Sequence, residues 1–313
     1  MRTAPLEDPI ETGGSTGRSM VPGDKRAGMI GLACVVFTAL GWGLNWPATK
    51  FLLTTCPPLS ARGVSGLVAG AVLFGVAVSL GESLAVPCAL WGRLGVAALL
   101  NVSAWMGLTT VSLVWLPAGQ AATLAYTMPV WVALLSWPML AERPTPRQIG
   151  AIVLGISGVV IQVGGTIFRL DAARLPGVII ALSAAVLFAF GTVLSKCMPI
   201  PLPRITLTAW QVFLGCIPLL ISGLLFEQAH FDALPVIGWL ALAYTAFVSM
   251  GACYLLWFAA VRRLNASSAA IGTLLTPVIG VAASAVALGD PLTLNQVVSL
   301  AFVVAGIMLA IRG

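Results

Sequence analysis

Residues 118–130 read AGQAATLAYTMPV, and residues 266–278 read ASSAAIGTLLTPV. Both segments carry the pattern Ala-x3-Ala-x6-Pro-Val, and they lie 148 residues apart. The same offset relates further residues along the chain: Trp91 with Trp239, Glu142 with Asp290, Gln148 with Gln296, and Gly158 with Gly306. A single match between apolar segments carries little weight, but matches at one register that include proline and polar positions indicate duplication. The sequence therefore predicts two halves that share one fold.

The composition places these halves in a membrane. The chain has 313 residues, of which 59% are hydrophobic and 8% are charged. Soluble proteins carry about 25% charged residues, so the polar side chains are too few to cover a water-soluble globule. The 33 glycines are typical of transmembrane helices, in which glycine is frequent.

Ten segments are long and apolar enough to cross a hydrocarbon core of about 30 Å, or nearly so. They are residues 30–52, 64–80, 94–114, 118–140, 148–166, 177–195, 206–226, 235–258, 267–288 and 294–311. Among the charged residues only Lys50 falls within these limits, close to a span end. We therefore expect an all-α membrane protein with ten transmembrane helices.

The basic residues define the orientation of these helices. Lys50, Arg62, Arg169 and Arg174 fall on one side of the membrane, and the other twelve basic residues fall on the opposite side. The side richer in Lys and Arg faces the cytoplasm, so both termini are expected there. The net charge of +6 is thus largely an orientation signal, and it does not indicate a nucleic-acid partner.

Five spans in each half make the repeat inverted, because an odd number starts the second half from the opposite side. We expect a disordered cytoplasmic tail at residues 1–28, a first repeat at 29–166 and a second at 177–312. Inverted repeats are typical of secondary transporters, whose substrate site lies near the midplane between the repeats.

The chain resembles the drug/metabolite transporter superfamily, in its EamA-type ten-helix branch. The resemblance rests on the run GWGLNWPATK at residues 41–50 and on the two Ala-Pro-Val segments with their trailing Glu142 and Asp290. It implies a central cavity lined by the first, third, fourth, sixth, eighth and ninth helices, in a branch that often exports amino acids and related metabolites from bacteria. One departure is that the sixth helix has FAFG at residues 188–191 where the first has WGLN.

Three prolines are candidate hinges. Pro129 and Pro277 fall at the centres of the fourth and ninth spans, and Pro47 interrupts the first. Proline removes a hydrogen bond to the carbonyl four residues earlier, and the freed carbonyl needs another partner in the bilayer. Such a site serves either as a hinge with carbonyls exposed to a cavity or as a static kink that aids packing.

Polar and aromatic side chains deep in the spans are candidates for the cavity wall. These candidates are Asn45, Trp46, Asn101, Trp105, Tyr126, Thr127, Tyr254, Thr273 and Thr276. Asparagine and tyrosine offer hydrogen bonds that suit a zwitterionic substrate. The alternatives for each are a hydrogen bond between helices, packing or anchoring at the membrane interface.

Lys50 has three alternative roles: its amine reaches the outer interface, guides a substrate carboxylate or pairs with a loop acid.

No Asp, Glu or His lies within the expected spans, which argues against a carboxylate proton relay and favours a neutral cavity. The six cysteines are scattered and there is a single histidine, so no metal or cofactor is expected. The sequence lacks a Walker A motif and any catalytic constellation, so the chain is not expected to be an enzyme.

These features together favour a facilitative exporter of amino acids or related small metabolites in a bacterial inner membrane. Its expected partners are the small-molecule substrate and the lipid bilayer, and the oligomeric state is left open. Two alternatives remain at this point, a nucleotide-sugar or sugar-phosphate exchanger and a membrane scaffold without transport.

Overall fold

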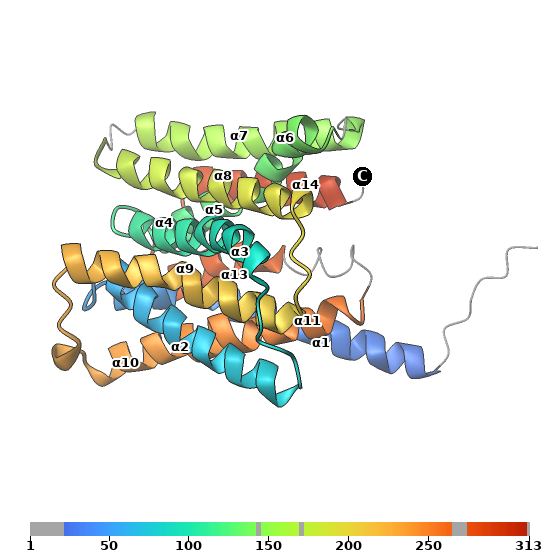
Figure 1. The fold of residues 1–313 in the computed structure, drawn as a ribbon. Helices are drawn as coiled ribbons and strands as arrows, with labels where there is room; N and C mark the ends of the chain where they lie inside the picture. Colours follow the sequence, from blue (N-terminus) through green and yellow to red (C-terminus); the bar gives the residue numbers. More distant parts are fainter. Residues whose placement is uncertain (1–21, 142–144, 169–171, 265–273, 312–313) are drawn as a thin grey trace, which may run out of the picture.

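The computed structural model describes residues 22–141, 145–168, 172–264 and 274–311, and within these ranges every regular element is a helix. The helices run mostly side by side in alternating directions. The start of α1 (Pro22–Leu52) and the end of α14 (Leu294–Ile311) lie at the same end of the bundle (Figure 1). The predicted tail is outside the described ranges up to residue 21, and α1 begins at Pro22, earlier than the expected tail boundary.

The remaining helices have the following bounds. The first half contains α2 (Pro58–Ser79), η1 (Cys88–Leu90), α3 (Trp91–Ala98), η2 (Leu99–Ala104), α4 (Trp105–Ser112), α5 (Ala118–Ala125), α6 (Met128–Leu140) and α7 (Pro146–Phe168). The second half contains η3 (Ala172–Arg174), α8 (Leu175–Cys197), α9 (Arg204–Phe226), η4 (Phe231–Ala233), α10 (Val236–Ala243), η5 (Tyr244–Ala252), α11 (Cys253–Val261), α13 (Leu275–Leu288) and α14.

Seven helical stretches among the described residues are long and apolar enough to cross a membrane. They are Gly28–Leu52, Pro58–Ser79, Cys88–Ser112, Ala118–Leu140, Ala172–Cys197, Arg204–Phe226 and Val236–Val261. Three shorter apolar helices cover Pro146–Gln162, Leu275–Leu288 and Leu294–Leu309. The described part of the chain is therefore an all-helical membrane architecture, as its composition predicts.

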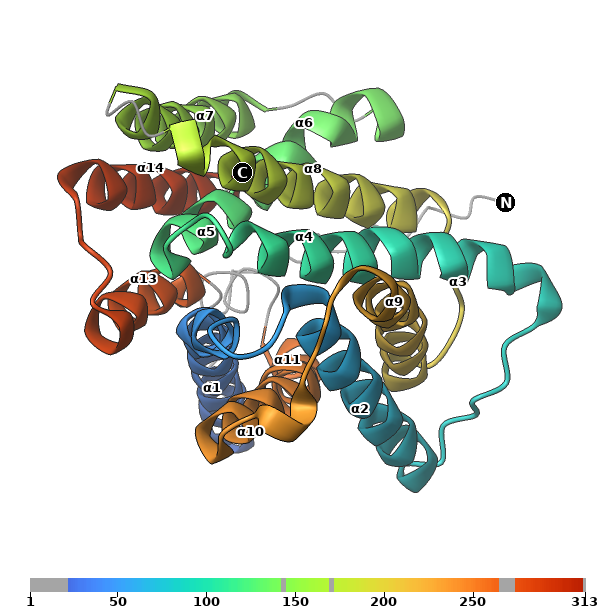
Figure 2. The same ribbon diagram turned by 90° about the vertical axis from the view of Figure 1, so that its left-hand side faces the viewer.

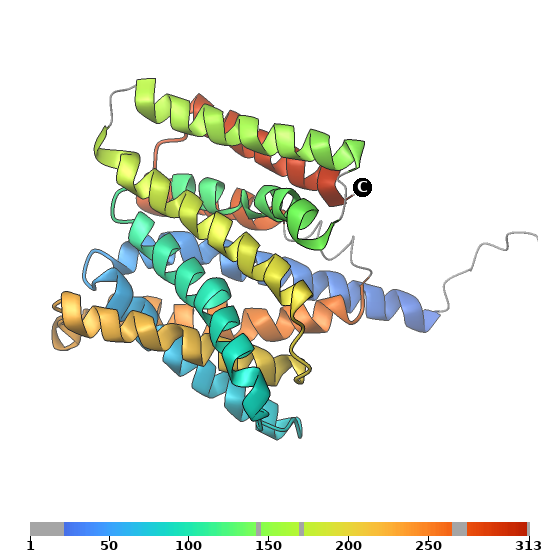
Figure 3. The same cartoon turned by 45° about the horizontal axis from the view of Figure 1, so that its top comes forward.

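Helices from the two halves pack against each other in pairs. α2 packs against α9, and α7 packs against α14, which lie side by side at one edge of the bundle (Figure 3). α1 packs against α13 and α11, while α8 packs against α6 and α4. The short helix α5 lies near the centre, with α4, α8, α13 and α14 around it (Figure 2).

Glycines allow α2 and α9 to approach closely. A Cβ atom added to Gly63 would lie 2.6 Å from the Leu220 backbone, and one added to Gly66 would lie 2.0 Å from the Cys216 Sγ. Gly223 on α9 faces the Ser60 backbone in the same way. Small residues at such contacts let helix backbones come together in lipid, where packing drives association.

Each of these two helices is capped by an acid that follows the other one. Glu227, directly after α9, accepts hydrogen bonds from the Leu59 and Ser60 N–H groups at 3.0 and 2.8 Å. Glu82, after α2, accepts from the Thr206 N–H at 2.8 Å near the start of α9. A carboxylate at a helix N-terminus satisfies free N–H groups and interacts favourably with the helix dipole. The caps therefore fix the antiparallel alignment of α2 and α9.

Irregular features recur at the offset of the sequence repeat. A π-helical segment occurs in both halves, as η2 and as η5, and the last six residues of η5 lie 148 positions after η2. Ala141 after α6 and Gly289 after α13, also 148 positions apart, both have left-handed backbones with φ of 55° and 70°. The two halves thus share local backbone geometry at positions that differ in residue type.

The fourth span is broken at the expected proline, but differently from a kinked helix. α5 ends at Ala125, and Tyr126 and Thr127 form a turn before α6 begins at Met128. Pro129 lies in the first turn of α6, where a missing N–H leaves no helical bond unmade. Pro277 lies in the first turn of α13, whereas α1 continues through Pro47 without a break.

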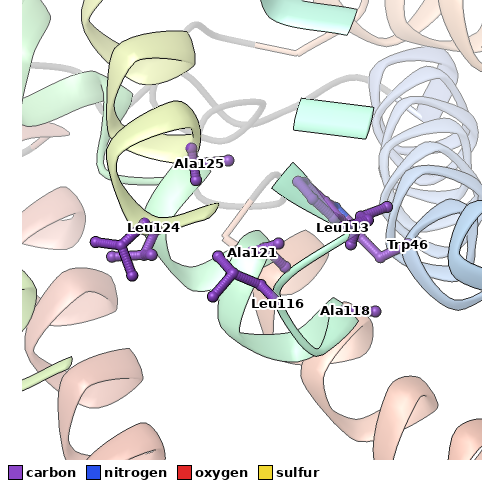
Figure 4. Close-up of a cluster of buried hydrophobic side chains, with 10 residues drawn as sticks. Trp46, Leu113, Leu116, Ala118, Ala121, Leu124 and Ala125 are labelled. Carbon is purple, nitrogen blue, oxygen red and sulfur yellow. The ribbon is translucent and has the colours of Figure 1, made fainter. Parts of the chain in front are cut away.

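A buried apolar cluster surrounds α5. It contains Trp46, Leu113, Leu116, Val178, Ala181 and five residues of α5, namely Ala118, Ala121, Ala122, Leu124 and Ala125. In Figure 4 the Trp46 side chain extends from α1 toward Leu113 and α5. Because alanines form one wall of this cluster, the helices come close together around the break that follows α5.

We expect the α2–α9 contact to be sensitive to added volume. Gly63→Ala should lower the free energy of unfolding by about 1–3 kcal/mol, because its Cβ meets backbone atoms that cannot move aside. Gly75→Ala on the same helix is the matched control, since no atom lies within 4 Å of its added Cβ. Its stability should be equal or higher. Thermal unfolding in detergent measures both, and equal midpoints for the two variants would contradict this packing.

Candidate functional site

A cavity of about 460 Å³ lies among helices of both halves. Its wall consists of Trp42, Asn45, Trp46, Thr49, Arg62, Trp105, Met106, Thr109, Leu113, Tyr126, Met128, Pro129, Phe188, Ser249, Met250, Tyr254, Trp257, Leu274, Thr276, Pro277 and Ile307. The helices that the resemblance implies all contribute, and α2 and α14 add one residue each. The volume is within the range of about 300–1,000 Å³ that is typical of small-molecule sites.

The structure brings most of the predicted site residues together on this wall. These are Asn45, Trp46, Trp105, Tyr126, Tyr254 and Thr276, together with the prolines Pro129 and Pro277. They come from segments that are far apart in the sequence, and the two prolines come from equivalent positions of the two halves.

Other predicted residues lie elsewhere. Asn101 is in the π-helical segment η2, and its Nδ2 donates a hydrogen bond to the Ser195 Oγ on α8 at 3.3 Å. The Thr127 hydroxyl donates to the Leu124 carbonyl at 2.6 Å, away from the cavity wall. Pro47 is buried within α1 and does not line the cavity, and Thr273 is outside the described residues.

Aromatic rings form two groups along the wall. Trp42 on α1 packs against Tyr254 and Trp257 on α11, with ring centroids 5.8 and 6.1 Å apart. In the second group, Tyr126 lies 6.2 Å from Trp46 and 6.5 Å from Trp105. Such a wall offers apolar surface and ring faces that attract cations.

Phe188 extends the second aromatic group, with its ring centroid 4.8 Å from that of Trp105. Phe188 belongs to the FAFG run, in which the sequence of the sixth helix differs from that of the first, and it still lines the cavity. Trp42 and Phe188 were not among the predicted site residues, although both lie in the quoted runs at 41–50 and 188–191. Both are aromatic residues within expected spans, and that is the signal that could have identified them.

Two buried acceptors on α1 have no hydrogen-bond partner among the described residues. They are the Asn45 Oδ1 and the Thr49 Oγ1, one helical turn apart. Both residues line the cavity, and Thr49 is only 3% exposed. A buried polar atom without a partner is costly, so these oxygens are suited to accept N–H groups from a bound molecule.

Arg62 corrects the expectation of a neutral cavity. The side chain is 7% exposed, lines the cavity, and donates from Nε to the Thr110 Oγ1 on α4 at 2.9 Å. The sequence predicts this residue in an outer loop, because it precedes the expected span that begins at residue 64. The helix instead begins at Pro58, with proline in its first turn and Glu227 as its cap. Lys50 is thus not the only charge within the spans.

Lys50 lies beside main-chain acceptors near the end of its span. Its Nζ donates to the main-chain carbonyls of Leu113 and Leu116, and the second of these bonds is 3.1 Å long. These carbonyls follow α4, where helical acceptors are unpaired. Asp290 is nearby and accepts from the Gly119 N–H at 3.4 Å in the first turn of α5. Lys50 therefore ties α1 to the segment that joins α4 to α5 and is absent from the cavity wall.

The chain matches a protein-family model twice. The model is described as the EamA-like transporter family, and it matches residues 29–164 and 175–312. Curated relatives include the "Uncharacterized transporter YvbV" of Bacillus subtilis, which is 33% identical over 280 residues that cover 88% of this chain and 89% of the relative.

A second relative is the "Probable amino-acid metabolite efflux pump" of Salmonella typhimurium, at 29% identity over 92% of this chain and 96% of the relative. The Escherichia coli protein of the same name is 26% identical over the same shares. A protein with a solved crystal structure aligns with a TM-score of 0.63 and 20% identity, covering 92% of this chain and 97% of the other. That likeness concerns the fold alone.

Proposed function

The chain belongs to the EamA-like transporter family, and from this premise we propose that it exports amino acids or related small metabolites by alternating access. In this proposal the protein has ten transmembrane helices in two inverted five-helix repeats, at 29–166 and 177–312. It lies in the inner membrane of a bacterium with both termini in the cytoplasm.

The exchange of helix contacts between the halves supports the inverted repeat. At the 148-residue offset, α8 corresponds to α1, α13 to α6, and α11 to α4. α1 packs against α13 and α11, and its counterpart α8 packs against their counterparts, α6 and α4. In the α2–α9 and α7–α14 pairs, each helix packs against its own counterpart. A pseudo-two-fold axis in the membrane plane relates the two halves of many secondary transporters in this way.

The observation that carries the proposal is the cavity and its two prolines. Pro129 and Pro277 line one wall at equivalent positions of the two halves, each in the first turn of a helix. A proline in the first turn of a helix removes no regular helical hydrogen bond, so α6 and α13 could swing about these turns. Alternate swings of the two helices would open the cavity to one side and then to the other.

The chemistry of the cavity supports small polar metabolites that also carry an apolar part. Aromatic rings cover much of the wall, and Asn45 and Thr49 provide unpaired acceptors. A nucleotide sugar or sugar phosphate needs several cations, but Arg62 is the one cationic side chain on the described cavity wall. A scaffold without transport gives no reason for a lined cavity between the halves.

A facilitative mechanism fits the distribution of acids. No Asp or Glu lies on the cavity wall as far as the structure describes it. Glu82, Glu227 and Asp290 instead cap helices near the ends of spans. Proton-coupled carriers commonly use intramembrane carboxylates as relays, and the described residues offer none.

Purified protein in proteoliposomes should therefore carry amino acids in a saturable manner. The assay compares uptake of labelled amino acids, amines and sugar phosphates, with protein-free liposomes as the control. Imposing a pH gradient should change the rate little. Absence of saturable flux for every amino acid contradicts the proposed substrate class, and a strict requirement for the gradient contradicts the facilitative mechanism.

Pro129 and Pro277 should control the rate of transport. Pro129→Ala allows one continuous helix through the turn at Tyr126 and Thr127, and Pro277→Ala removes the fixed backbone angle in the first turn of α13. Each change should lower the transport rate several-fold while the protein stays folded. Pro138→Ala is the matched control, because Pro138 is exposed within α6 and does not line the cavity. Initial rates in proteoliposomes measure the effect, and unchanged rates in both hinge variants would show static kinks.

The proposed orientation predicts that Cys88 and Cys197 face the cytoplasm. Both thiols are exposed, whereas the other four cysteines are not. At the opposite end, burial and the nearby Glu227 raise the pKa of the Cys56 thiol to about 11, so it should be unreactive at neutral pH.

A membrane-impermeant maleimide should label the protein in inside-out vesicles and not in intact cells. The double variant Cys88→Ser, Cys197→Ser should be unlabelled in both preparations. Labelling of the original protein in intact cells would reverse the orientation.

A further inference from the structure

The guanidinium of Arg62 is a buried cation that lacks an acidic partner. No ion pair involving it occurs within the described residues, and its one hydrogen bond there is the Nε donation to Thr110. An isolated charge in an apolar interior is strongly unfavourable unless it is paired. The cost of keeping this arginine on the wall of a cavity points to a partner that arrives there.

The neighbours of Arg62 leave its outer N–H groups for that partner. A guanidinium has five N–H donors, and the Thr110 bond uses only the one at Nε. That bond anchors the side chain between α2 and α4, and the residue still forms part of the cavity wall. The surrounding groups, which include Tyr254 and Cys216, are not carboxylates.

We propose that Arg62 binds the carboxylate of the transported molecule. This inference rests on the proposed function and narrows its substrate class to molecules with one free carboxylate and an apolar portion. The two terminal nitrogens of a guanidinium match the two oxygens of a carboxylate in a planar pair of hydrogen bonds. The aromatic groups around Trp42 and Trp46 then receive the rest of the molecule.

A carboxylate fits the site better than a phosphate ester. A phosphate monoester carries close to two negative charges at neutral pH, and the described wall offers a single cation. One charge would then stay unpaired in a largely apolar space, at the cost that applies to any buried ion. A single carboxylate matches the one charge of Arg62, and the ammonium of an amino acid would donate to the unpaired Asn45 and Thr49 oxygens.

The test compares aromatic probes with and without a carboxylate. Quenching of tryptophan fluorescence reports binding, because Trp42, Trp46, Trp105 and Trp257 line the cavity. The probes are L-phenylalanine, 3-phenylpropionate, L-phenylalaninamide and phenethylamine, added to the full-length protein in detergent. The two carboxylates should bind about tenfold more tightly than the amide and the amine, the discrimination expected when a buried charged donor is left unpaired.

Variants at Arg62 test whether this side chain causes the preference for carboxylates. Arg62→Gln should remove the preference for carboxylates, and Arg62→Lys should restore part of it, because lysine keeps the charge but loses the planar pair of donors. Arg93→Gln is the matched control, since Arg93 is exposed on α3 and should leave the preference unchanged. Size-exclusion profiles and thermal unfolding confirm that each variant is folded.

The inference is overturned if the original protein binds all four probes alike or binds neither carboxylate. It is also overturned if Arg62→Gln retains the original ratio of affinities. Failure of the proposed function is seen separately, in proteoliposomes, as the absence of amino-acid flux by the original protein. A protein that binds carboxylates through Arg62 without carrying amino acids would therefore support this inference and contradict the proposed function.

Discussion

The structure depends on one constraint, which is that polar groups within a bilayer must find partners inside the protein. The three acids with described bonds obey it by leaving the apolar interior and capping helices. Glu82, Glu227 and Asp290 accept main-chain N–H groups at the starts of α9, α2 and α5. Lys50 does the same for main-chain acceptors, because it donates to carbonyls that follow α4. Charges thus complete helix ends, and the spans between those ends stay apolar.

Arg62 is the exception that gives the cavity its character. Its burial would destabilise a static bundle, because among the described residues only Thr110 accepts a hydrogen bond from it. Arg62 lines the same cavity as the unpaired oxygens of Asn45 and Thr49, so the cavity has donors on α2 and acceptors on α1. The aromatic rings on its wall supply a less polar surface, so the cavity suits a molecule with charged and apolar parts.

The all-helical membrane architecture could be predicted from the sequence because the length of the apolar runs reflects the thickness of the bilayer. The wall residues Asn45, Trp46 and Tyr126 could also be identified, since polar and aromatic groups deep in a span need a neighbour. Arg62 was missed because a hydropathy criterion assigns a charge near a span end to the loop. Asn101 lies off the wall, in the π-helical segment η2, and donates to Ser195 on α8 instead. A π-helical segment changes which residues share a face with those on either side of it. Periodicity of 3.6 residues cannot anticipate that change.

The reciprocal caps between α2 and α9 also restrict how the halves can move. Each acid belongs to the chain beyond one helix and is bonded to the first turn of the other. Sliding of α2 along α9 would break the hydrogen bonds of both carboxylates at once. The close backbone contacts at the glycines also leave no space for one helix to shift past the side chains of the other. A rearrangement that preserves both caps would keep α2 and α9 together as one unit. The two helices, one from each half, would then form a fixed pair relative to which the remaining helices tilt.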